Sequence, residues 1–187
     1  MFWPLNPQKR TPDVGYADKA YFAGIKGPGG KWLVTPGSWH TGVDLNGPSG
    51  GDSDLGQPVH AVDAGLVVFS GLGRGNTWGN LVVLWHEAAK VWTRYAHLDR
   101  RLVGTGDRVA AGQPIGTIGK GAFNKLTAHL HLDVLVKKPL DAAGHANWSH
   151  WPGGDMNQLK TYYADPMEFF GKQLMVKPPK WDGVRYV

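Results

Sequence analysis

The run Leu81-Val82-Val83-Leu84-Trp85 is the clearest indicator of fold class in this chain of 187 residues. Five consecutive apolar residues after a turn-forming segment, residues 76–80, are typical of a strand that is buried on both faces. Glycine (27) and proline (13) are abundant, which favours short strands joined by turns over long helices. Further β-type runs are Val59–Asp63, Leu66–Ser70, Val91–Ala96, Val109–Ala110, Ile115–Ile118 and His129–Val136. The sequence therefore predicts a fold dominated by β-strands, with few short helices.

A short internal sequence repeat indicates how these strands are organised. Gly56-Gln57-Pro58-Val59 recurs as Gly112-Gln113-Pro114-Ile115, and a short β-type run follows each time. The repeat predicts two similar β-hairpin units packed into a sandwich or barrel.

The length of the chain predicts a single domain. We expect an irregular N-terminal arm packed on the domain (1–36), a core (37–140), and a region with an insertion loop, a short helix and a C-terminal tail (141–187). One helix start is well signalled, because Asp165 can cap it, Pro166 fits the first position and Glu168 has the capping-box spacing. That helix should end near Gly171. The long insertion 141–164 carries several aromatic residues and is expected to have a function or to form a wall.

Composition excludes some classes of function. There is no cysteine, so thiolate zinc ligands and thiol nucleophiles are excluded. The net charge of +5 suits a polyanionic partner, but no run of Lys or Arg and no nucleic-acid module appears. No apolar stretch approaches the ~20 residues of a membrane helix, and no signal-peptide layout is visible at the start. We expect no nucleic-acid partner, no membrane insertion and a monomer.

Three short motifs carry the ligand types that bind zinc, neutral imidazole and ionised carboxylate. They are His40-Thr41-Gly42-Val43-Asp44, Tyr95-Ala96-His97-Leu98 and His129-Leu130-His131. The i, i+2 spacing places His129 and His131 on one face of a strand. One ring can then bind a metal while the other reaches the attacking water, but spacing alone does not say which. Gly42 and the following Gly47-Pro48 favour a loop or a short extended segment between His40 and Asp44, not a helical turn.

Together these motifs resemble the signatures of the lysostaphin/LytM-type zinc metallopeptidases. Segments 56–62, 65–68 and 106–116 are also similar to the connecting strands of that family, and the resemblance runs from about Gly37 to Val136. It implies a duplicated β-hybrid barrel-sandwich in which two related β units form an open groove around one zinc ion. It also implies a catalytic zinc peptidase core (37–140) that cuts peptide bonds in the cross-links or stems of bacterial peptidoglycan, outside the cytoplasm.

Carried over by position, the resemblance implies that His40, Asp44 and His131 bind one Zn²⁺ per chain. His97 and His129 would form the catalytic pair. Three protein ligands leave the fourth position of zinc open to water, which is typical of a catalytic site. We expect His129 to take the proton of the attacking water, and His97 to stabilise the oxyanion or protonate the leaving amine. These two roles are interchangeable at this stage.

The chain departs from the family pattern at two places next to the His129-Leu130-His131 motif. Residues 123–128 stand where the family usually has a glycine-rich turn, so the substrate preference transfers less readily. Leu132-Asp133 replaces the usual Phe-Glu. Asp133 shares a strand face with His129 and His131, which makes it a candidate to orient a histidine by hydrogen bonding. The alternative is a simple carboxylate on the groove rim.

The function expected from these residues is a zinc-dependent endopeptidase, either a phage lysin or another cell-wall hydrolase, secreted, periplasmic or phage-delivered. One alternative is a non-hydrolytic binding or regulatory module on the same scaffold, as in family members that have lost their zinc residues. Another is a phosphocarrier-type β-sandwich with paired histidines, in which Asp44 would have no use.

Overall fold

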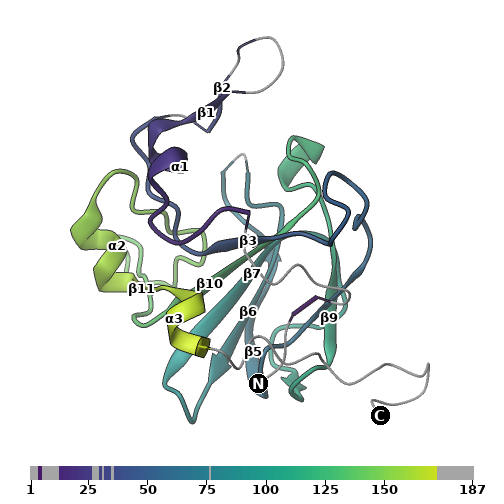
Figure 1. The fold of residues 1–187 in the computed structure, drawn as a ribbon. Helices are drawn as coiled ribbons and strands as arrows, with labels where there is room; N and C mark the ends of the chain where they lie inside the picture. The colour runs from purple at the N-terminus through teal and green to yellow at the C-terminus, as the bar shows by residue number, and fades with distance from the viewer. Residues whose placement is uncertain are drawn as a thin grey trace.

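A computed structural model describes residues 4–5, 13–26, 30, 32–34, 36–75 and 77–171 (Figure 1). Within these residues, nine strands form one open, antiparallel sheet and two further strands form a separate hairpin. Parts of the predicted N-terminal arm (1–3, 6–12, 27–29, 31 and 35) and most of the predicted C-terminal tail (172–187) lie outside the described residues. The prediction of a β-dominated fold with few short helices is confirmed.

The described elements occur along the chain in a fixed order. They are α1 (Lys19–Ala23), β1 (Ile25–Lys26), β2 (Trp32–Val34), β3 (Val43–Leu45), β4 (Pro58–His60), β5 (Gly65–Leu72), β6 (Asn80–His86), β7 (Val91–Arg101), β8 (Arg108–Val109), β9 (Pro114–Ile118), η2 (Ala122–Asn124), β10 (Leu130–Leu135), α2 (Met156–Tyr162), β11 (Tyr163–Ala164) and α3 (Pro166–Phe170).

The sheet branches at the long strand β7. Its main path runs β11-β10-β7-β6-β5-β8, and Figure 1 shows the long strands β5, β6, β7 and β10 side by side. The C-terminal part of β7 also pairs with β9. Leu98 lies opposite Ile118, and a register shift separates this pair from Arg101 opposite Gly116. Strand β9 in turn pairs with β4, with Val59 opposite Gly116. The two copies of the sequence repeat, residues 56–59 and 112–115, therefore lead into neighbouring antiparallel strands.

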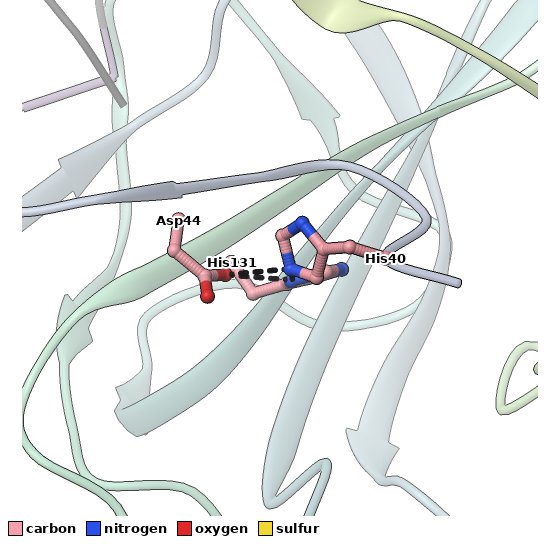
Figure 2. A group of neighbouring side chains, drawn as sticks. All are labelled: His40, Asp44 and His131. Carbon is pink, nitrogen blue, oxygen red and sulfur yellow. Dashed lines mark hydrogen bonds and ion pairs between the residues drawn. The ribbon is translucent and has the colours of Figure 1, made fainter. Parts of the chain in front are cut away.

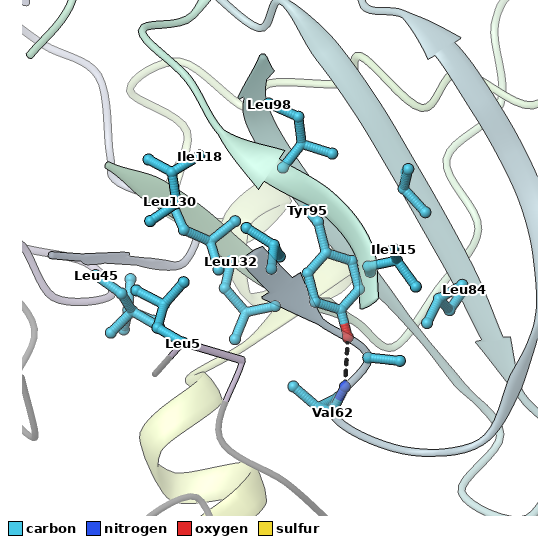
Figure 3. Close-up of a cluster of buried hydrophobic side chains, with 14 of the residues drawn as sticks. Leu5, Leu45, Val62, Leu84, Tyr95, Leu98, Ile115, Ile118, Leu130 and Leu132 are labelled. Atoms are coloured by element: carbon cyan, nitrogen blue, oxygen red, sulfur yellow. Dashed lines mark hydrogen bonds between the residues drawn. The ribbon is translucent and has the colours of Figure 1, made fainter. Parts of the chain in front are cut away.

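Strand β10 alternates its two faces in the way that a strand requires. Leu130, Leu132 and Val134 belong to the main hydrophobic core. Figure 3 shows Leu130 and Leu132 among other buried side chains of this core. His131 and Asp133 point to the opposite face and are also buried. Tyr95 is also part of this core, and its hydroxyl accepts a hydrogen bond from the Val62 amide at 2.9 Å (Figure 3). One strand thus joins the core to the functional face.

The expected helix at residues 166–171 is confirmed as α3. The Asp165 carboxylate accepts a hydrogen bond from the Met167 amide at 2.8 Å, and Gly171 caps the end. The sequence analysis did not predict α1 and α2, which have five and seven residues and aspartate N-caps at Asp18 and Asp155. Such short helices depend on their caps and on packing, because isolated helices of this length are unstable. In the described ranges, no helix is long and apolar enough to cross a membrane.

The extended segment between His40 and Asp44 ends in strand β3, which packs tightly on β10. A Cβ atom placed on Gly42 would lie 2.1 Å from the Leu132 carbonyl oxygen and 2.8 Å from an Asp133 carboxylate oxygen. Only glycine fits this close approach of two backbones.

We predict that Gly42→Ala lowers the free energy of unfolding by about 2 kcal/mol, because the added methyl group forces β3 away from β10. Urea denaturation measures the change. Gly104→Ala is the matched control, because the nearest atom to its Cβ is 3.7 Å away. Equal stability of the two variants would contradict the proposed packing.

Candidate metal centre

The register of β10 with its two neighbours brings the motifs together. His131 lies directly opposite Asp44 of β3 on one side and Ala96 of β7 on the other. Directly opposed residues of antiparallel strands have Cβ atoms about 4.5–5.5 Å apart. Asp44 is therefore beside His131, and His97 is one position further along β7.

Three side chains converge on one point (Figure 2). His40 Nε2 lies 3.1 Å from Asp44 Oδ1 and 3.0 Å from His131 Nδ1, and the Asp44 and His131 atoms are 2.9 Å apart. All three residues are buried. Burial disfavours a charge on Asp44, but His40, His129 and a hydrogen bond from His131 outweigh it and hold the pKa of Asp44 well below its usual range. The cluster therefore offers an ionised carboxylate and two imidazoles.

This donor set fits a zinc ion. Ligand atoms bound to a tetrahedral zinc lie about 3.3–3.6 Å from one another, a few tenths of an ångström more than the 2.9–3.1 Å observed. The second nitrogen of each histidine is also engaged, as it is in most zinc sites. His40 Nδ1 donates to the Gly15 carbonyl oxygen at 2.9 Å, and His131 Nε2 lies 3.0 Å from Asp133 Oδ1.

Asp133 is fully buried and does not lie on the groove rim. Its Oδ2 atom accepts a hydrogen bond from Arg94 Nε at 2.5 Å, and Arg94 is directly opposite it on β7. Burial disfavours both charges, but their attraction lowers the pKa of Asp133 and raises that of Arg94. Burial also opposes a charge on His131, yet Asp133 and Asp44 together raise its pKa to about 9, so at neutral pH the ring carries a proton that it releases when it binds a metal. Asp133 thus remains a carboxylate that turns Nδ1 of His131 toward Asp44.

His97 lies next to this cluster in a constrained conformation. Its φ of +63° is in the left-handed region, which is costly for a residue other than glycine and is often found at functional sites. His97 Nδ1 is 3.0 Å from the Thr77 carbonyl oxygen and 3.2 Å from that of Trp78. Because carbonyl oxygens only accept, Nδ1 carries the hydrogen. Burial, together with His129 and His131, lowers the pKa of His97 well below its usual value, so the ring is neutral.

His129 completes the group. Its ring centroid is 4.7 Å from that of His97, and its Nε2 atom is 3.7 Å from Asp44 Oδ1. His129 Nδ1 donates to the Thr127 carbonyl oxygen at 2.7 Å. The structure therefore brings together all six residues that the sequence singled out, from β3, β7, β10 and the segments that precede β3 and β10.

A cavity of about 600 Å³ is lined by five of these residues, all except Asp133. Its walls are partly aromatic. The rings of Trp78 and Trp151 pack edge to face with their centroids 5.4 Å apart, and the centroid of the Tyr21 ring lies 4.7 Å from that of His40. The expectation that the insertion 141–164 forms a wall is confirmed for Ser149 and Trp151.

Sequence reasoning missed several contributors to the site. The Gly15 carbonyl and Tyr21 come from the predicted N-terminal arm, where no motif marks them. Arg94 lies within the predicted strand Val91–Ala96, and the structure shows that it is buried there. A charged residue inside a predicted strand could have indicated a buried, paired charge.

The sequence is similar to known proteins of one peptidase family. The sequence model of peptidase family M23 matches residues 38–142. The chain is 40% identical over 97 residues to the peptidoglycan DD-endopeptidase ShyC of Vibrio cholerae, covering 52% of this chain and 20% of that protein. It is 36% identical over 110 residues to a lipoprotein NlpD/LppB homolog of Pseudomonas aeruginosa, covering 58% of this chain and 34% of that one. The chain thus spans between a fifth and about a third of the length of these two relatives.

The fold has a matching relative among solved structures. The solution structure of lysostaphin aligns with a TM-score of 0.52 and 25% identity, covering 92% of this chain and 62% of that one. The family match spans more than half of the chain and includes His40, Asp44, His97, His129 and His131. The chain therefore belongs to peptidase family M23.

Proposed function

We propose that this protein is a zinc-dependent endopeptidase that hydrolyses peptide bonds in bacterial peptidoglycan, outside the cytoplasm. The observation that carries the proposal is the convergence of His40, Asp44 and His131 within 3.1 Å of one another, in a cavity that His97 and His129 also line. The name of the relative ShyC supports peptidoglycan as the substrate.

In this proposal, His40 Nε2, the Asp44 carboxylate and His131 Nδ1 would hold a zinc ion. The ion would act as a Lewis acid and lower the pKa of a water molecule from 15.7 to about 7. The residues around it contribute orientation: the Gly15 carbonyl and Asp133 each fix one histidine ring. Because the described residues provide three protein ligands at this point, the arrangement suits catalysis better than a purely structural role.

We assign proton transfer to His97 and His129. Each has its Nδ1 hydrogen committed to a backbone carbonyl, which leaves Nε2 as the proton acceptor. The role of base, which we expected for His129, is equally available to a neutral His97. The pair is proposed to take the proton of the attacking water and deliver it to the leaving amine, in steps that need a ring nitrogen within hydrogen-bond reach.

Hydrolysis is favoured over the two alternatives by the residues themselves. A non-hydrolytic module on this scaffold has no need to keep three buried ligands, a buried His97 and a half-buried His129 around one point. A phosphocarrier has no use for an ionised Asp44 that contacts two histidines.

We predict that the purified protein binds one zinc ion, and that His40→Ala, Asp44→Ala and His131→Ala each lose it, because two ligands do not hold zinc tightly. Metal content measured by mass spectrometry tests this. His145→Ala is the control, because that side chain is 81% exposed and outside the cavity. Stoichiometric zinc in His131→Ala would refute the ligand set.

His97→Ala and His129→Ala are expected to keep their zinc and to lose activity by 10²-fold or more, roughly the contribution of general acid–base catalysis. Mass spectrometry of muropeptides released from purified cell walls measures the rate. Undiminished release by either variant would remove that residue from the mechanism.

Asp133→Asn should weaken zinc binding by about 10- to 100-fold, since the amide no longer holds His131 as the carboxylate does. Competition with a chelator measures the affinity, and a thermal melt shows whether the variant is folded. Affinity within twofold of the wild-type value would rule out an orienting role for Asp133.

A further inference from the structure

The cavity has an uneven distribution of charge. Apart from histidines, three charged side chains line it among the described residues: Asp13, Asp44 and Arg74. Asp13 accepts a hydrogen bond from Asn46, and Asp44 belongs to the metal cluster. Arg74 is exposed, and within the described part of the chain no carboxylate forms a salt bridge with it. It is thus the one Lys or Arg that the described cavity wall presents to a ligand.

The backbone of Arg74 is held in place by the insertion. Its amide donates to Ser149 Oγ at 2.7 Å, and the Ser149 carbonyl accepts from Trp78 Nε1 at 3.2 Å. The carbonyls on either side of Ser149 accept hydrogen bonds from Arg94 Nη1 at 2.9 and 3.1 Å. Residues 148–150 therefore connect Arg74 on the rim to the buried Arg94 beside Asp133.

Arg74 is close to the reacting centre. Thr77, whose carbonyl binds His97, follows it by three residues. An extended chain spans at most about 3.3–3.6 Å per residue, so the two Cα atoms are within about 11 Å. Arg74 lines the same cavity of about 600 Å³ as His97 and His129, so a peptide bound in that cavity can contact all three side chains.

Asp141, an acidic neighbour of Arg74, already has other hydrogen-bond partners. Arg74 contributes to a lowered pKa of Asp141, but Asp141 Oδ1 already accepts hydrogen bonds from the amides of Ala143 and His145 at 3.0 and 2.9 Å. A guanidinium group binds a carboxylate through two parallel hydrogen bonds. It binds an uncharged amide less strongly, because the attraction between opposite charges is then missing.

We propose that Arg74 is a specificity-determining residue that binds a free carboxylate of the substrate next to the scissile bond. The preferred substrate is then a cross-link through a diamino acid whose carboxylate is free, and not an uncharged glycine bridge. This inference rests on the proposed peptidase function.

Two soluble cross-linked peptides test it, identical except that one carries the free carboxylate and the other its carboxamide. The wild-type protein should cleave the carboxylate peptide roughly tenfold faster or better, the effect of one charged hydrogen-bonded pair, mainly through a lower KM. Arg74→Ala should lose this preference with kcat and zinc content unchanged. Arg74→Lys should recover part of it, and Arg74→Glu should favour the carboxamide.

Arg108→Ala is the matched control, because Arg108 is an exposed arginine on β8 that does not line the cavity. It should keep the wild-type preference. A carboxylate preference that persists in Arg74→Ala would overturn the inference.

Failure of the proposed function gives a different result. In that case the wild-type protein cleaves neither peptide, and calorimetric binding of the same two peptides decides the inference. A carboxylate preference that Arg74→Ala abolishes supports it, and equal binding by the wild-type protein overturns it.

Discussion

The pairing register of β10 is the constraint on which the rest of the structure depends. Asp44 on β3 and Arg94 on β7 lie opposite His131 and Asp133, so two cross-strand pairs build the proposed metal centre. A slip by one residue would turn His131 toward the core and Leu132 toward the site. Burial of the leucines on the other face of β10 opposes this slip. The hydrophobic core and the metal centre are therefore specified by the same alternation.

Arg94 shows how buried charge serves orientation in this protein. A buried ion pair adds little net stability, because desolvation offsets the attraction between its charges. Here the guanidinium fixes the Asp133 carboxylate, which fixes His131, and it also binds the carbonyls of Trp148 and His150. Its Cζ atom lies 4.0 Å from the centroid of the Trp78 ring. One side chain thereby joins the metal ligands to the segment that carries Trp151.

Much of this arrangement could be predicted from the sequence, for identifiable reasons. The apolar run Leu81–Trp85 is short and follows a turn-forming segment, which favours a strand buried on both faces, and Asp165-Pro166 is a strong helix start. The three histidine motifs carry ligand types that bind zinc, and strand pairing brings these motifs together. Strand β3 was not predicted as a strand, because three residues are too short to show a period. The Gly15 carbonyl was missed because every residue has a carbonyl, and only the folded chain shows which one meets His40.

The most direct test of this account is anomalous diffraction at the zinc edge from crystals grown with saturating zinc. The account predicts one zinc site, about 2.0–2.2 Å from His40 Nε2, an Asp44 carboxylate oxygen and His131 Nδ1. Zinc bound elsewhere, or no anomalous density among these three side chains, would contradict it.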